Sequence, residues 1–160
     1  MFDQSLQTRR WLDAEAREGR TPDEIRARRI AALLIAVNAL VGYAFNVLLT
    51  GGRTVPRLPL LPLAVGLALA WYLYKLRPRA ESFAIALAIL WSTLLPLLYF
   101  LRVPFVYALV QSVVIWGLAG ALLLLLIGRP TRRRQATAVG LFVLACLVFA
   151  LGVVRLLGGG

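Results

Sequence analysis

Two asparagines lie inside the first long apolar run of this sequence, at a spacing that brings them together. Asn38 and Asn46 are eight residues apart with Gly42 midway, so in a helix all three share one face. An amide in hydrocarbon needs a hydrogen-bond partner, and a glycine lets another helix approach closely. This face is therefore either the surface through which the helix packs against its neighbours or the wall of a cavity for a solute.

Gln111 and Trp116 carry polar groups in a later apolar run. We expect the Gln111 amide to meet the face of the first helix, with Asn46 as its partner, in an interhelical hydrogen bond or in the same cavity wall. The indole N–H of Trp116 needs an acceptor, whether the ring packs in the core or stacks on a ligand.

Ser92 is singled out by a proline. Pro96 has no N–H, so the Ser92 carbonyl four residues earlier loses its helical partner, and we expect a kink there. The hydroxyls of Ser92 and Thr93 are expected to help satisfy this stretch of backbone. The candidate intramembrane polar or packing face thus comprises Asn38, Gly42, Asn46, Gln111, Ser92 and Trp116.

Residues for the common catalytic and metal chemistries are scarce. The chain has no histidine, its one cysteine is Cys146, and Glu81 is the only acid after Glu24. Metal sites need clusters of His, Cys or carboxylate, and a serine nucleophile needs a base. We therefore predict no catalytic residue, no metal and no cofactor. Glu81 is expected to cap its helix or to pair with Arg77 or Arg79.

The composition is that of a membrane protein. Hydrophobic residues make up 61% of the 160 residues, and the mean hydropathy is +0.81, whereas soluble domains are less apolar. The charges behind the net +11 lie mostly between apolar runs, so they indicate topology and anionic headgroups rather than nucleic acid. The lipid bilayer is the expected partner, and the candidate anionic-lipid contacts are Arg129, Arg132, Arg133 and Arg134.

The apolar runs predict an all-α fold with five transmembrane helices in one bundle, over 22–157. Thr21 and Glu24 have capping-box spacing, which predicts a helix over 22–49. Its uncharged part covers about 30 Å, the thickness of a hydrocarbon core. Residues 1–21 are expected to be a cytoplasmic segment, as a loose tail or an interfacial helix anchored by Trp11, and 158–160 a flexible tail. The predicted spans are 30–49, 58–76, 83–101, 105–127 and 136–157.

Basic residues alternate between the two sides of this arrangement. Fourteen of the 18 lie in 1–29, 75–79 and 129–134, and the other four lie in the alternate loops and at Arg155. By the positive-inside rule the N-terminus is cytoplasmic and the C-terminus outside. We therefore expect a multi-pass protein of the inner (cytoplasmic) membrane.

Small residues add packing signals in the last two spans, at Gly117 and Gly120 and in the Ala136 and Gly140 pair. Taken together, the sequence predicts a non-catalytic integral membrane protein, an accessory or structural component of a homo- or hetero-oligomeric assembly. One alternative is a small carrier or channel for a neutral or apolar solute, with the polar face lining its cavity. A second is a membrane-embedded enzyme that acts on lipid.

Overall fold

The protein is all-helical in the residues that its computed structural model describes, which are 19–49, 60–76, 79–102 and 105–158. Within them there are five helices. The predicted helical class is confirmed, and so is the single first helix, which begins at Pro22 and ends at Leu49. The helices are α2 (Pro22–Leu49), α3 (Leu60–Tyr74), α4 (Ala80–Arg102), α5 (Phe105–Leu126) and α6 (Arg132–Gly158).

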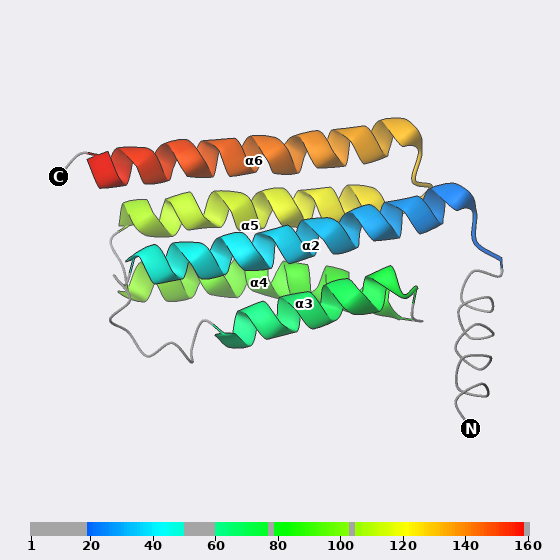
Figure 1. Ribbon diagram of the computed structural model, residues 1–160, viewed down its shortest axis with the longest axis horizontal. Helices are drawn as coiled ribbons and strands as arrows, with labels where there is room; N and C mark the ends of the chain where they lie inside the picture. The colour runs from blue at the N-terminus through cyan, green and yellow to red at the C-terminus, as the bar shows by residue number, and fades with distance from the viewer. Residues whose placement is uncertain (1–18, 50–59, 77–78, 103–104, 159–160) are drawn as a thin grey trace, which may run out of the picture.

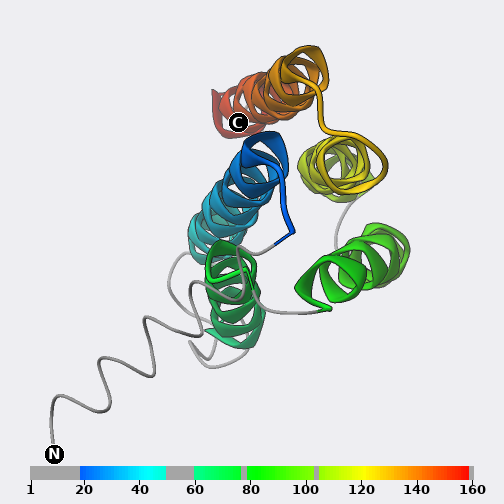
Figure 2. The same cartoon turned by 90° about the vertical axis from the view of Figure 1, so that its right-hand side faces the viewer.

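The helices run side by side and alternate in direction (Figure 1). Viewed end-on, α2 packs against α3, α5 and α6, while α5 also packs against α4 and α6 (Figure 2). The α3 and α4 helices follow each other in the chain but pack weakly along their length. One end of the bundle, where α2, α4 and α6 begin and α3 and α5 end, carries most of the described arginines. We call it the basic end.

The start of α2 follows from its local sequence. The backbone N–H of Thr21 donates to the Glu24 carboxylate at 2.9 Å, and the Glu24 N–H donates to the Thr21 hydroxyl at 3.3 Å. These reciprocal bonds satisfy backbone donors that the first turn of a helix leaves without partners. The acids Asp23 and Glu24 also lie at the positive end of the helix dipole.

In the described part of the chain, three helical stretches are long and apolar enough to cross a membrane: Pro22–Phe45, Leu109–Leu126 and Arg132–Arg155. Among the described residues, Leu60–Tyr74 and Ala80–Leu94 are apolar but shorter. At 15 residues, α3 is about 22 Å long, against about 30 Å of hydrocarbon. It is shorter than the predicted span at 58–76, of which 58 and 59 lie outside the described residues. At the other end of the chain, α6 includes Gly158, which the sequence analysis placed in the tail.

Small residues set the closest helix contacts. A Cβ on Gly66 of α3 would lie 2.7 Å from the Ala39 Cβ of α2, and one on Gly117 of α5 would lie 2.3 Å from the Ala145 Cβ of α6. Neither position has room for a methyl group. The two helix backbones of each pair can approach this closely because a glycine lies at the contact. Gly140 on α6 differs, because no described residue of another helix lies within 4 Å of the place its Cβ would take and the residue is exposed. Among the described residues, Gly140 therefore makes no close helix contact, and Ala136 is exposed.

We expect Gly117→Ala to lower the free energy of unfolding by about 1–3 kcal/mol, because the added methyl group forces α5 away from α6. Gly140→Ala adds the same methyl group in open space, so it should leave that free energy unchanged or raise it by up to about 1 kcal/mol. Unfolding titrations with sodium dodecyl sulfate in mixed micelles measure both. Equal effects of the two substitutions would contradict the packing of α5 on α6.

Candidate functional site

Gln111 lies in the contact between α5 and α2. Its side chain is buried, with the residue 6% exposed. The Gln111 Nε2 atom lies 3.7 Å from the position that a Cβ on Gly42 would take, so the α5 amide faces the glycine of the predicted stripe. Asn38, one turn earlier on α2, is half-buried, and the Asn46 side chain lies outside the described part of the chain. The predicted face of α2 thus meets α5 at Gly42, the smallest residue of that face.

The buried amide of Gln111 is only partly satisfied. Its Oε1 atom is buried and has no hydrogen-bond partner among the described residues. A buried acceptor without a partner is unfavourable, by about 1–3 kcal/mol. The adjacent Ser112 is fully buried as well. The α2–α5 seam is therefore polar at this depth, yet closed by side chains.

Trp116 supplies the bond that Pro96 removes from α4. Its indole N–H donates to the Ser92 carbonyl at 3.0 Å, the carbonyl that would otherwise accept from residue 96. The Ser92 and Thr93 hydroxyls do not serve this carbonyl, because they donate to the Ile89 carbonyl at 2.9 and 3.1 Å. The expectation that these hydroxyls satisfy the position freed by the proline is therefore corrected: a side chain of the neighbouring helix does so.

The polar residues of the candidate face form two separate contacts rather than one site. Gln111 faces α2, whereas Trp116 faces α4. Five residues separate them on α5, which turns their side chains about 140° apart. Gly42 with Gln111 and Ser92 with Trp116 therefore lie on different helix seams.

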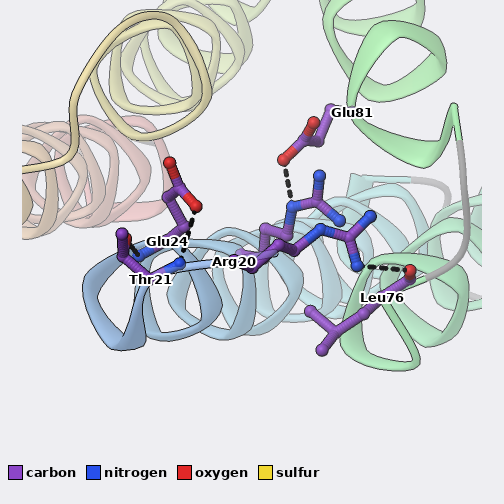
Figure 3. A network of polar contacts seen from close by, with 6 residues as sticks. Arg20, Thr21, Glu24, Leu76 and Glu81 are labelled. Carbon is purple, nitrogen blue, oxygen red and sulfur yellow. Dashed lines mark hydrogen bonds and ion pairs between the residues drawn. The ribbon is translucent and has the colours of Figure 1, made fainter. Parts of the chain in front are cut away.

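A second set of polar contacts lies at the basic end. It includes an ion pair that the sequence did not predict. The Nε of Arg28 on α2 donates to the Glu81 carboxylate in the first turn of α4, 53 residues away (Figure 3). Glu81 was expected to cap its helix or to pair with Arg77 or Arg79; it does lie in the first turn of α4, and Arg77 lies outside the described residues. Glu81 pairs with an arginine whose residue is only 8% exposed, and whose Nη1 atom is buried without a partner among the described residues. A guanidinium withdrawn from water binds a carboxylate strongly.

The Arg28–Glu81 pair bridges helices that otherwise pack little. In the end-on view α2 and α4 lie diagonally across the bundle (Figure 2). The sequence did hold a signal for Arg28, since Ala31, Ala32 and Ile35 follow it at helical spacing and all three are buried. Arg28 therefore lies on the packing face of α2. It was counted only as a topological charge.

Arg20 closes the turn after α3. Its Nη1 donates to the Leu76 carbonyl at 3.1 Å (Figure 3). Leu76 is buried and has φ 56°, and Arg79 has φ 64°, a conformation that is unfavourable for residues with a Cβ. Burial, and then the nearby Arg28 guanidinium, lowers the pKa of Arg20. The guanidinium still stays charged at neutral pH, because its ordinary pKa is so high.

Gln135 joins the beginning of α6 to the beginning of α2. Its Nε2 donates to the Asp23 carbonyl and to the Pro130 carbonyl, both at 3.1 Å, and the residue is buried. No sequence pattern singles it out, because a single amide after an arginine run is usually solvated. The beginning of α2 therefore contacts three other parts of the bundle. Arg20 reaches the turn after α3, Arg28 reaches α4, and the Asp23 carbonyl accepts from Gln135 of α6.

The arginines after α5 are more open. Arg129, Arg132 and Arg133 are exposed, while Arg134 is half-buried and donates through Nη1 to the Arg129 carbonyl at 3.4 Å. The backbone N–H of Arg134 also meets the Thr131 hydroxyl at 3.4 Å, which caps α6. Three of the four guanidinium groups therefore face outward at the basic end.

The described residues hold no group of three or more His, Cys, Asp or Glu side chains that could bind a metal ion. What the arrangement supplies is ion pairing, amide hydrogen bonds and cationic surface. Comparisons of the chain with family models, with curated proteins and with solved structures find no match.

We expect the Arg28–Glu81 pair to show coupling in a double-mutant cycle. Arg28→Gln should lower the free energy of unfolding by about 1–3 kcal/mol, because the Glu81 carboxylate loses its partner. The effects of Arg28→Gln and Glu81→Gln should be non-additive by about 0.5 kcal/mol or more. Arg26→Gln, an exposed position on the same helix, is the matched control and should change stability by less than about 0.5 kcal/mol. Additive effects in detergent unfolding would contradict the pair.

Proposed function

We propose that this chain is a non-catalytic integral membrane protein that acts as an accessory or structural component of a membrane assembly. The supporting observation is that the Gln111 side chain is buried, with its amide against Gly42 of α2. In a carrier, such an amide would face a path that a solute can enter. Here the amide lies instead in the contact between α5 and α2.

Two further observations support the same proposal. The indole N–H of Trp116 is used on the backbone of α4, so it serves packing. The apolar side chains on the outer surface are numerous, including Leu144, Leu147 and Leu151 on α6. Such a surface suits lipid or the helices of a partner.

The second candidate function is a small carrier or channel for a neutral solute, and one observation favours it. The Oε1 atom of Gln111 is buried and has no partner among the described residues, so it has an unused acceptor. A lipid-acting enzyme, the third possibility, has no such observation behind it.

The proposal includes five spans, with the N-terminus in the cytoplasm, in the inner (cytoplasmic) membrane. Three helices of spanning length and alternating direction support it, as does the gathering of arginines at the basic end. Although α3 is short, flanking aromatic and basic residues such as Trp71 and Lys75 allow a short helix to span, because they reach the headgroup layer. The exposed Arg129, Arg132 and Arg133, with Arg134, then contact anionic headgroups.

Thiol labelling tests the closure of the α2–α5 seam. In a Cys146→Ser background reconstituted in lipid nanodiscs, Gln111→Cys should react with a water-soluble maleimide at least about ten times more slowly than the exposed control Thr131→Cys, because a buried thiol is inert. Asn38→Cys reports the half-buried position on the same seam. Labelling of Gln111→Cys and Asn38→Cys as fast as that of Thr131→Cys would overturn the accessory proposal in favour of the carrier.

Reporter fusions test the number of spans. A reporter placed after Gly160 should be active only if it functions outside the cytoplasm, because five crossings carry the chain to the opposite side from residue 1. A fusion after Arg129, in the loop before α6, is the matched control and should report the cytoplasm. A strong cytoplasmic signal from the fusion after Gly160 would contradict the odd count.

A further inference from the structure

Four residues at the seam of α2 and α3 form one continuous surface feature, which we call the aromatic–basic patch: Arg29, Trp71, Tyr74 and Lys75. The Arg29 guanidinium lies over the Tyr74 ring, 5.5 Å from its centroid, and the Lys75 ammonium lies 5.0 Å from the Trp71 centroid. The two rings stack on each other, with centroids 6.5 Å apart and an interplanar angle of 25°. Each cation is therefore held by a ring, and the rings hold each other.

The aromatic–basic patch is open to its surroundings. Trp71 is 60% exposed and Tyr74 is 47% exposed, and Arg29 is exposed as well. Large aromatic side chains on the outside of a membrane helix, at its end, are typical of the headgroup layer. The patch lies at the end of α3 and the second turn of α2, at the basic end.

Other contacts already engage two of the three described acids. Glu81 pairs with Arg28, and Glu24 accepts the Thr21 N–H. Asp23 is exposed in the first turn of α2, six residues before Arg29, which places it about 120° away around the helix. The ion pair found in the described residues leaves out both Arg29 and Lys75. The patch therefore has positive charge available for an anion.

The chemistry of these side chains suits a phosphate ester. A guanidinium next to an aromatic ring keeps five N–H donors, and its fork of donors matches the oxygens of a phosphate. The Lys75 ammonium adds a compact second charge with three donors. The exposed ring surfaces provide apolar contact for the glycerol and upper acyl carbons of a lipid, which a soluble phosphate lacks.

We propose that the aromatic–basic patch binds the headgroup phosphate of an anionic phospholipid from the basic-end leaflet. Arg29 and Lys75 contact the phosphate, while Trp71 and Tyr74 hold the two cations in place and pack against the lipid. This site is separate from Arg129 and the arginines that follow it. It does not depend on the accessory role, which thiol labelling tests independently.

Native mass spectrometry of the full chain in detergent tests the proposal, with added phosphatidylglycerol and, as the neutral reference, phosphatidylcholine of the same acyl chains. The wild-type protein should retain phosphatidylglycerol preferentially. Arg29→Gln/Lys75→Gln should weaken that binding about thirty-fold, at about five-fold for each cation. Arg132→Gln/Arg133→Gln is the control of equal charge and should weaken it less than Arg29→Gln/Lys75→Gln does.

A second variant distinguishes a specific lipid-binding site from general electrostatic attraction between the basic end and anionic lipid. Trp71→Leu/Tyr74→Leu keeps both cations but removes the rings, and it should weaken phosphatidylglycerol binding by about three- to ten-fold, because each cation loses its positioning contact. Circular dichroism and gel filtration verify that every variant retains the wild-type fold. Unchanged binding in this variant, or an equal loss from Arg132→Gln/Arg133→Gln, would overturn the proposal. Displacement of the lipid by millimolar inorganic phosphate would also overturn it, because the ligand would then be a soluble anion.

Discussion

The structure depends on the rule that the backbone polar groups of an apolar bundle must find partners within the protein. Water is absent from hydrocarbon, and each unsatisfied backbone group there costs several kcal/mol. The contact between Trp116 and Ser92 illustrates the rule. Pro96 removes one backbone donor from α4, and the indole N–H of α5 replaces it at 3.0 Å. This bond lets α4 continue to Arg102 as one helix and also fixes how α4 and α5 face each other.

The same rule explains why α2 is the centre of the bundle. Its beginning carries Arg28, which reaches Glu81 of α4, and Arg20 immediately before it binds the Leu76 carbonyl after α3. The Asp23 carbonyl of α2 accepts from Gln135 of α6. Further along α2, Ala39 and Gly42 let α3 and α5 approach. Polar contacts at one end thus set the order of the helices, and small side chains set their separations. The hydrophobic effect cannot do either, because lipid is as apolar as the helix surfaces.

Much of the fold could be predicted from the sequence, and less of the candidate site. Five apolar runs separated by basic loops predicted five helices, and the capping residues Thr21 and Glu24 predicted where α2 begins. Helical periodicity also placed Asn38 and Gly42 on one face. It did not reveal that Glu81 pairs with Arg28, 53 residues away, or that Gly140 has open space around it. Periodicity fixes the direction of a side chain around its own helix, whereas the neighbour that it meets depends on how separate helices are arranged.

The sequence by itself determined the apolar character, the helical class and the charge asymmetry of this protein, because hydropathy, capping and the distribution of arginines are local properties of the chain. Only the tertiary structure decided which polar groups share a contact. It gave Gln111 and Trp116, which helix periodicity already turns apart on α5, their particular neighbours: Gly42 of α2 and the Ser92 carbonyl of α4. It also brought Arg29 of α2 onto Tyr74 of α3. The physical reason is that a hydrogen bond or a cation–π contact acts over only a few ångströms, so it exists only where two helices have already come together.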